Sequence, residues 1–357
     1  MIRAGIVGVG YWGPNLLRNL AENSEIAIRW ICDTNSEVLG KLGSRYPSST
    51  TTTRYADLLS DCSLDLIVVA TPVHNHFDLV CQALNAGKHV LVTKPMAITE
   101  HDCRIMIELA EKRRRVLMVD HTFAYHPAVA TLKNLVKKNE LGDLLYFQSS
   151  RMNLGLYQAD VSVIYDLMPH DLSILSELVN EDPVEISVSA KCAARLPQPD
   201  IAFMNLNYES HFIASIQASW LSPMKTRHVT LTGTKKMVVY DDMDVVQKVK
   251  VFDKGIETLA NVSREESYTR FIQYRQGDMY APAIANTEAL KLEIEHLVHC
   301  IYNDQVPKTS GYQGLRVVRL LEKADELARS NRCWAPLNIR KSPSTSYRVD
   351  AKTLTAA

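Results

Sequence analysis

The sequence predicts an α/β protein with an N-terminal Rossmann domain and a C-terminal α+β domain built on a large, mostly antiparallel, open-faced sheet. The chain has 357 residues, which is enough for two hydrophobic cores. Strands alternate with helices in the first third, which is typical of a parallel sheet, and strands follow one another directly from about residue 143, which favours antiparallel pairing. We expect the Rossmann domain at residues 1–122, the substrate-binding and oligomerisation domain at 123–335 and a C-terminal extension at 336–357.

Apolar runs separated by amphipathic segments define the first domain. The runs are IRAGIVGVG, IAIRWICD, LDLIVVATP, HVLVTKP and VLMVDHT, and the helical segments include PNLLRNLAEN, HFDLVCQALNAG and EHDCRIMIELAEKRRR. In the second domain, seven strand-like segments run from DLLYFQSSRMNL to QKVKVFD, and two helical segments follow, ALKLEIEHLVHCIYN and GYQGLRVVRLLEKADELARS. These patterns predict βαβ units followed by a single large sheet with helices after it.

The overall composition excludes several classes of protein. Basic and acidic residues both number 40, so no net charge draws the chain to nucleic acid or to an anionic membrane. The seven cysteines are scattered without a C-x-x-C pair, which favours a reduced, cytoplasmic protein without a structural metal. No segment reaches the ~20 apolar residues of a membrane span, and the glycine-interrupted start does not read as a signal peptide. The polar end, KSPSTSYRVDAKTLTAA, is expected to be a loose tail.

A glycine-rich motif follows the first predicted strand directly. Gly8, Gly10 and Gly13 form G-x-G-x-x-G in GVGYWGPNLLRNL, with Tyr11 and Trp12 inside the motif and a helix after it. Glycines at this spacing allow a tight turn and a close approach of the backbone to a pyrophosphate, which the helix N-terminus attracts. The motif predicts a dinucleotide site, although a plain glycine turn has the same letters.

An acidic residue at the end of the second predicted strand strengthens this interpretation. Asp33 lies twenty residues beyond Gly13, at the position where a carboxylate accepts hydrogen bonds from the ribose hydroxyls of NAD and repels a 2′-phosphate. We therefore expect NAD(H) to be preferred over NADP(H); otherwise Thr34, Asn35 or Arg54 sets the choice. Methyltransferases also combine a glycine loop with such an acid, but they do not account for the motifs that follow.

Three segments together resemble the glucose–fructose oxidoreductase and inositol dehydrogenase (Gfo/Idh/MocA) family over about residues 1–330. They are GIVGVGYWG, VVATPVHNHFDLVCQALNAGKHVLVTKPMA and DLMPHDLSIL. The resemblance implies an NAD-dependent enzyme that acts on a secondary hydroxyl, with Lys94 pointing at that hydroxyl and an often cis peptide bond before Pro95. The family usually has glutamate where this chain has Thr93. Cofactor contacts are implied at Lys94 and Pro95 and, after the third strand, at Thr71, Pro72, His74 and His76.

The family's D-x-x-x-H motif is matched by Asp166 and His170. The four-residue spacing places both side chains on one helix face, which requires Pro169 to lie in the first turn of that helix. His170 would serve as the acid/base, Lys94 would stabilise charge on the reacting oxygen, and Asp166 would fix the histidine tautomer or bind a substrate hydroxyl. A single histidine near a helix start is also commonly a cap or a packed residue.

Polar side chains after the domain crossover are candidates for the substrate pocket. They are His121, Tyr125, Arg151, Asn153, Tyr157 and Asp160, with His126 beside them. Lys225 and Arg227 lie two apart on a predicted strand and so share a face; they are either surface charges or ligands for a substrate phosphate.

The branch that the chain most resembles acts at C3 of nucleotide-linked sugars such as UDP-N-acetylglucosamine or its uronate. A sugar or nucleotide sugar is therefore the expected substrate. Inositol, a free or phosphorylated sugar and a 3-ketosugar fit the same residues. The fungal galactose-gene repressor resembles the family without catalysis, so a non-enzymatic dinucleotide-binding regulator is a further alternative. The resemblance also implies a homodimer or homotetramer, in which the uncovered sheet face would pair subunits.

Overall fold

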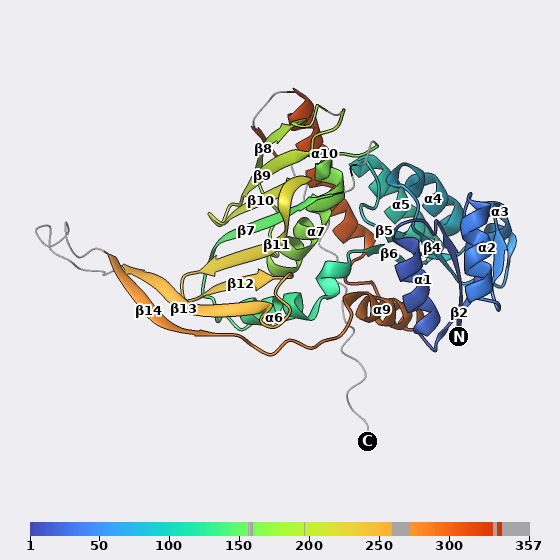
Figure 1. The fold of residues 1–357 in the computed structure, drawn as a ribbon, viewed down its shortest axis with the longest axis horizontal. Helices are drawn as coiled ribbons and strands as arrows, with labels where there is room; N and C mark the ends of the chain where they lie inside the picture. The colour runs from blue at the N-terminus through green and yellow to red at the C-terminus, as the bar shows by residue number, and fades with distance from the viewer. Residues whose placement is uncertain (156, 158–159, 196, 259–271, 331–333, 338–357) are drawn as a thin grey trace, which may run out of the picture.

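The computed structural model describes residues 1–155, 157, 160–195, 197–258, 272–330 and 334–337. The predicted C-terminal extension lies outside these residues except for its first two positions. Two sheets stand beside each other, the first surrounded by helices and the second covered by helices on one face (Figure 1). This arrangement confirms the predicted α/β fold class with a Rossmann sheet and a second, mostly antiparallel sheet.

The first sheet has six parallel strands in the order β3-β2-β1-β4-β5-β6. Its strands and helices are β1 (Ile2–Val7), α1 (Gly13–Glu22), β2 (Ile26–Cys32), α2 (Ser36–Arg45), β3 (Thr50–Thr52), α3 (Tyr55–Ser60), β4 (Leu66–Val69), the 3-10 turn η1 (Val73–Asn75), α4 (His76–Asn85), β5 (His89–Thr93), α5 (Glu100–Arg113) and β6 (Leu117–Asp120). Every residue of β4 is buried, as expected for a central strand with helices on both faces. Every residue of the edge strand β6 is buried as well. The strand order reverses between β1 and β4, and ligands bind at the carboxyl ends of the strands at such a reversal.

The second sheet contains nine strands among the described residues, in the order β14-β13-β12-β11-β7-β10-β9-β8-β15. The strands are β7 (Leu144–Leu154), β8 (Glu185–Lys191), β9 (Ile201–Asn207), β10 (Ile213–Ser219), β11 (Leu221–Gly233), β12 (Met237–Asp241), β13 (Val249–Thr258), β14 (Ile272–Tyr280) and β15 (Trp334–Pro336). The pair of β7 and β10 is parallel, and the other described pairs of this sheet are antiparallel.

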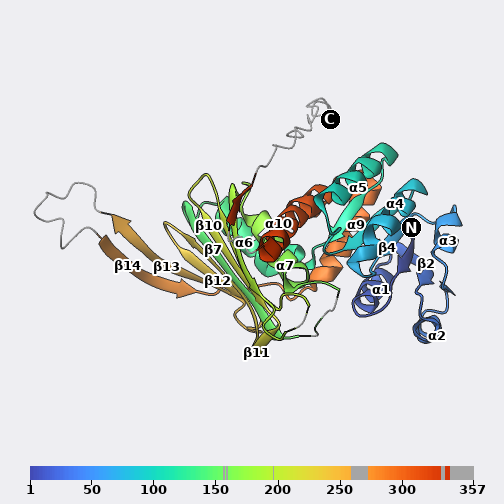
Figure 2. The same ribbon diagram turned by 90° about the horizontal axis from the view of Figure 1, so that it is seen from above.

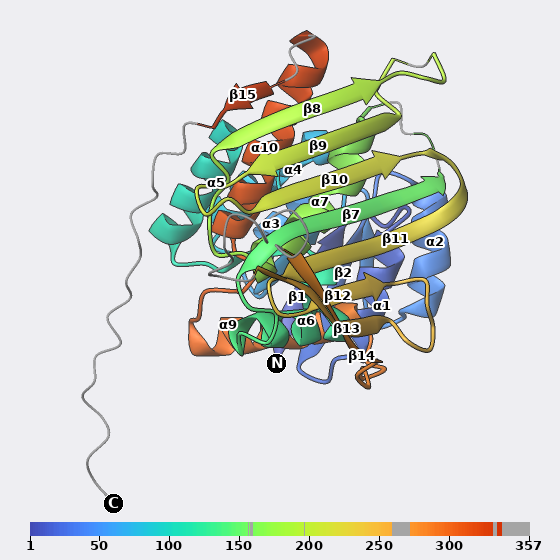
Figure 3. The same ribbon diagram turned by 90° about the vertical axis from the view of Figure 1, so that its left-hand side faces the viewer.

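In the part of the chain that the structure describes, helices cover only one face of the second sheet. The 3-10 turn η2 (Thr122–Tyr125) leads into α6 (Pro127–Lys137), and α7 (Val163–Leu178) and α10 (Gly311–Ser330) lie on the same side (Figure 2). The opposite face is uncovered in Figure 3 and carries Tyr146, Phe203 and Ile213, each 40–48% exposed. The predicted open face is therefore present.

Helix α9 (Ala289–Asn303) follows the second sheet in the chain but packs on the first domain. Its residues Leu290, Ile294 and Leu297 are buried in the same core as Leu16 and Leu17 of α1. The division predicted at residue 122 places α9 with the second domain, because sequence order alone does not show that the chain returns. In the described residues, no helix is both long and apolar enough to cross a lipid bilayer.

The prediction for Pro169 was wrong. Helix α7 begins at Val163, so Pro169 lies in its second turn and not in the first. A proline there removes the N–H that would bond the Tyr165 carbonyl and pushes against that carbonyl. The chain tolerates this in a helix that is otherwise well buried against the second sheet.

Candidate active site

The glycine loop has the shape that a dinucleotide needs. Gly8 has φ of +88°, and a Cβ at this position would lie 2.7 Å from the Ala70 carbonyl. A Cβ at Gly13 would lie 2.2 Å from the Gly8 carbonyl oxygen, whereas a Cβ at Gly10 would meet no atom within 4 Å. Gly8 and Gly13 are therefore required by the fold, while Gly10 faces open space in front of α1, where a pyrophosphate can approach the backbone.

Asp33 stands at the carboxyl end of β2 and is fixed to the glycine loop. Its Oδ2 accepts a hydrogen bond from the Val9 N–H at 2.7 Å, and its Oδ1 accepts one from the Asn35 N–H at 2.9 Å. Each carboxylate oxygen keeps a further lone pair for a ribose hydroxyl. These residues fit the adenosine half of NAD.

Tyr11 and Trp12 of the loop differ in their surroundings. The Tyr11 side chain is 86% exposed. The Trp12 indole Nε1 donates to Asp120 Oδ2 at 2.6 Å, which ties the loop to the end of β6. Asp120 was not among the predicted site residues, since nothing in the sequence marks it apart from its position after an apolar run.

The loop after β4 gives a correction. His76 was predicted to contact the cofactor, but it is buried, and its Nδ1 and Nε2 lie 3.0 and 2.8 Å from the carbonyl oxygens of Pro95 and Thr71. The Thr93 hydroxyl also lies 3.3 Å from Nε2, so the ring joins this loop to the end of β5 through Pro95 and Thr93. His74 is exposed and lies 3.2 Å from the Asp160 carbonyl oxygen, which belongs to the second domain, and Pro72 ends the turn before η1.

Lys94 and Asp166 form an ion pair that joins the two domains. The Lys94 Nζ donates to the Asp166 carbonyl oxygen at 2.6 Å and to its Oδ1 at 3.2 Å, with 22% and 17% of the two side chains exposed. The Lys94–Pro95 peptide bond is cis, as the resemblance implied. Lys94 is therefore held at the end of β5 with its ammonium against the first turn of α7.

The second Asp166 oxygen accepts a hydrogen bond from the Trp220 indole Nε1 at 3.0 Å. The carboxylate is thus shared by Lys94 and Trp220, and it forms no hydrogen bond with His170 in the described part of the chain. The sequence suggested that Asp166 fixes the histidine tautomer or binds a substrate hydroxyl; its carboxylate contacts Lys94 and Trp220 instead of the histidine. Trp220 was missed, because its only signal was a tryptophan at the end of a predicted strand.

The His170 ring is unprotonated at neutral pH. Its ring meets the Phe123 ring edge-on at a centroid distance of 5.1 Å, and its Nδ1 is buried without a hydrogen-bond partner among the described residues. Burial, together with the positive charges of Lys94 and Arg151, holds the pKa of His170 well below 6.5. An unprotonated imidazole beside a cationic lysine can accept a proton from a hydroxyl.

Three predicted substrate residues are buried; two of them bind other side chains, and the ring nitrogens of the third, His121, have no hydrogen-bond partner among the described residues. Arg151 forms a two-pronged ion pair with Asp171 at 2.8 and 3.1 Å, so its guanidinium is used inside the protein. The Tyr125 hydroxyl bonds the Thr309 hydroxyl at 3.1 Å. His121 is 1% exposed, and burial and the Lys94 charge lower its pKa to about 3.

The remaining predicted substrate residues, Asn153, Tyr157 and Asp160, lie between the end of β7 and the start of α7. The Tyr157 ring packs edge-on against Trp220 at 5.3 Å, and its hydroxyl accepts from the Gln198 N–H at 3.3 Å. Asn153 is half-buried and Asp160 is exposed. Tyr157 thus contacts Trp220, whose indole N–H donates to Asp166 of the Lys94–Asp166 ion pair.

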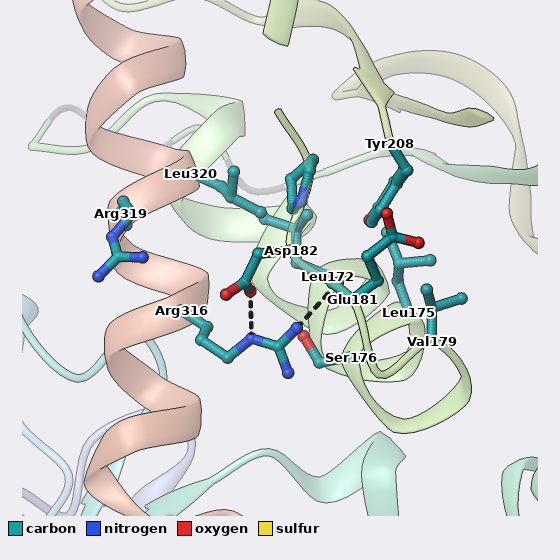
Figure 4. Close-up of a pocket in the computed structure, with 11 residues that line it drawn as sticks. Leu172, Leu175, Ser176, Val179, Glu181, Asp182, Tyr208, Arg316, Arg319 and Leu320 are labelled. Atoms are coloured by element: carbon teal, nitrogen blue, oxygen red, sulfur yellow. Dashed lines mark hydrogen bonds and ion pairs between the residues drawn. The ribbon is translucent and has the colours of Figure 1, made fainter. Parts of the chain in front are cut away.

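A separate surface pocket lies at the far end of α7, between that helix and α10 (Figure 4). Its Arg316 donates to Asp182 Oδ1 at 2.7 Å and to the Glu181 carbonyl at 3.0 Å. Arg319 of the pocket instead donates to Glu100 at 3.1 Å. The pocket is not part of the Lys94 site.

Comparison with known proteins identifies the family. Residues 2–121 match the oxidoreductase family with an NAD-binding Rossmann fold, and residues 129–239 match the GFO/IDH/MocA C-terminal domain. The chain belongs to the Gfo/Idh/MocA oxidoreductase family. Both halves of this Gfo/Idh/MocA protein thus match in the order in which the two sheets occur.

Curated relatives of this family member include sugar-related dehydrogenases. UDP-N-acetylglucosamine 3-dehydrogenase from Acidithiobacillus ferrooxidans is 25% identical over 89% of this chain and 94% of its own length, and its solved structure has a TM-score of 0.77 over 92% of this chain and 98% of that one, at 21% identity. Inositol 2-dehydrogenase from Salmonella typhimurium is 28% identical over 52% of this chain and 57% of its own length. The structure of GenD2 from gentamicin A biosynthesis in complex with NAD has a TM-score of 0.79 at 20% identity, over 95% of this chain and 97% of that one.

Proposed function

We propose that this protein transfers hydride between NAD and a secondary hydroxyl, at C3, of a sugar or nucleotide sugar such as UDP-N-acetylglucosamine or its uronate. The observation that carries the proposal is the Lys94 ammonium held by Asp166 beside the neutral His170. The relative that acts on UDP-N-acetylglucosamine supports the nucleotide sugar, because the alignment covers nearly its whole length. Inositol, a free or phosphorylated sugar and reduction of a 3-ketosugar are the alternatives within the same chemistry.

Each side chain has a defined task in this proposal. Bound NAD supplies the hydride acceptor. His170 removes the hydroxyl proton, which a neutral imidazole with a low pKa can do without first losing a proton of its own. Lys94 faces the negative charge that develops on the oxygen, and Asp166 and Trp220 keep the ammonium in place.

The test is NADH formation with a panel of nucleotide sugars, free sugars, sugar phosphates and inositol. Lys94→Met should reduce turnover on the accepted substrate by about 10²–10³-fold, the usual loss for one electrostatic donor. Its affinity for NAD should be unchanged, because Asp33 and the glycine loop lie elsewhere. Full-rate hydride transfer by Lys94→Met would exclude the proposed role of the lysine, and binding of NAD with no reaction on the whole panel would favour a non-catalytic regulator.

We also propose that NAD(H) is preferred over NADP(H). The Asp33 carboxylate is held by two backbone N–H groups, so it cannot turn away from a 2′-phosphate without losing them. Of the alternative determinants, Asn35 is used as the N-cap of α2, and the Arg54 side chain is 76% exposed beside Asp57. The carboxylate is therefore the group best placed to set the choice.

The uncovered face of the second sheet supports a proposed homodimer or homotetramer. Tyr146, Phe203 and Ile213 are exposed on this face without a helix over them. An open sheet that carries aromatic and aliphatic side chains is commonly buried against a second copy. Light scattering at micromolar concentration should give at least twice the monomer mass of 40.2 kDa, and a strictly monomeric species would contradict the proposal.

A further inference from the structure

Arg227 lies on the helix-covered face of the second sheet, next to the proposed reaction centre. In the pairing of β11 with β7, Arg227 stands opposite Arg151, and residues that pair directly across an antiparallel ladder point to the same face. Arg151 points towards α7, where it binds Asp171. The Arg227 guanidinium carbon lies 5.4 Å from the centre of the Phe123 ring, whose edge contacts His170.

A carboxylate at the end of β12 holds Arg227 in this position. Asp242 accepts hydrogen bonds from Arg227 Nη1 at 3.1 Å, from the Tyr240 hydroxyl at 3.1 Å and from Lys248 Nζ at 3.3 Å. The His126 Nδ1 accepts from the Ala128 N–H at 3.0 Å, so its proton is on Nε2, which faces Asp242 Oδ1 at 3.8 Å. Although burial raises the pKa of Asp242, the Arg227 hydrogen bond and the Lys248 charge lower it overall, so the carboxyl is ionised.

This cluster has more positive than negative charge. Arg227 and Lys248 share the single carboxylate of Asp242, and His126 is neutral because burial lowers its pKa. The two arginines over Phe123 therefore differ. Arg151 is almost fully buried and uses two nitrogens on Asp171, whereas Arg227 is 34% exposed and has one ion-pair partner, contacted through Nη1, among the described residues. The other donors of its guanidinium point to no protein acceptor there.

We propose that Arg227 is a specificity-determining residue that binds a carboxylate or phosphate group of the sugar substrate. A guanidinium fixed at one nitrogen keeps a planar set of donors that matches either anion. Arg227 and His170 both contact Phe123, at 5.4 Å and 5.1 Å from the centre of its ring, so a sugar that reacts beside His170 can carry its anion to Arg227. The inference rests on the proposed function and narrows its substrate class to acidic sugars.

Matched pairs of substrates test the proposal and separate the two sources of the anion. UDP-N-acetylglucosaminuronate and UDP-N-acetylglucosamine differ in one carboxylate, and glucose 6-phosphate and glucose differ in one phosphate. For the pair that the enzyme accepts, Arg227→Met should raise KM for the acidic member by roughly 10–100-fold, the range for losing a hydrogen bond to a charged group. KM for the member that lacks this group should stay within about twofold. The KM of Arg227→Lys for the acidic member should lie between the values of the unaltered enzyme and of Arg227→Met.

Lys225→Met is the matched control. Lys225 is an exposed cation on the same strand, in the irregular part of β11 where the pairing with β7 is interrupted. It should leave both KM values unchanged. Melting temperature and NAD affinity, measured first, show that Arg227→Met is folded; if it is not, Asp242→Asn, which keeps the arginine but loosens it, should raise KM for the acidic member alone. Equal losses for both members of a pair, or no loss, would overturn the role of Arg227. Absence of hydride transfer by the unaltered protein to any substrate would instead count against the proposed function.

Discussion

Replacing Arg151 should destabilise the protein through the carboxylate that remains. The Arg151 and Asp171 side chains are only 5% and 2% exposed, and their two hydrogen bonds are 2.8 and 3.1 Å long. Arg151→Met leaves an uncompensated charge in the core, which costs ~3–5 kcal/mol of unfolding free energy. Because 1 kcal/mol shifts Tm by about 2–4 °C in a domain of 150–250 residues, Tm should fall by roughly 6–20 °C.

Scanning calorimetry of three variants isolates the cause. Arg151→Met combined with Asp171→Leu removes both charges and should recover most of the lost stability. Arg3→Met breaks an ion pair with Asp65 whose side chains are 45% and 35% exposed, so it should change little. The reasoning is refuted if Arg151→Met melts like the unaltered protein and shows only a raised KM for substrate, since Arg151 would then be a binding residue, as its sequence position first suggested.

Three further outcomes concern the cofactor and the base. Gly10→Ala should keep its melting temperature but weaken NAD binding in calorimetric titration, whereas Gly13→Ala should lose stability because its Cβ would meet the carbonyl of the preceding turn. Asp33→Ser should narrow the difference between the binding free energies of NAD and NADP, obtained from their Kd values, by ~1–3 kcal/mol, the penalty for an unpaired polar group; tighter NADP binding by the unaltered protein would contradict this. Because the folded pKa of His170 lies well below 6.5, kcat/KM should hold as pH falls to about 6.5 and drop only below it; a limb centred above pH 6.5 would assign the base elsewhere.

Features that depend on neighbouring residues in the chain could be predicted from the sequence. The glycine spacing fixes the turn after β1, since Gly8 has a positive φ and a Cβ at Gly13 would meet the Gly8 carbonyl five residues earlier. The further contact that a Cβ at Gly8 would make with Ala70 is long-range and is not visible in the motif. The position of Asp33 at the end of β2 could be predicted because one helix and one strand separate it from the glycine motif. The alternation of inward and outward residues also gave most strands of the second sheet, because the period of two is a property of each strand alone.

Features that depend on distant partners could not be predicted. Asp166 is 72 residues from Lys94 and 54 residues from Trp220 in the chain. No local pattern therefore shows that its carboxylate oxygens bind these two side chains and not His170. Arg151 looks like an exposed cation in its strand until Asp171 is placed beneath it. The rule that proline belongs in the first turn of a helix misplaced Pro169. It describes an isolated helix, whereas α7 is stabilised by the packing of its many buried residues.

The same long-range contacts explain why both domains are needed for one reaction. Lys94 comes from β5, His170 and Asp166 from α7, and Trp220 from the corner between β10 and β11, so the reacting groups meet only when the two sheets keep one arrangement. Helix α9 returns to the first domain and buries its apolar face there, and the bond between Tyr125 and Thr309 joins η2 to the segment that follows α9. These contacts fix the second sheet to the first on the side away from the open face, so contacts between copies can form on that face without disturbing the distance from Lys94 to Asp166.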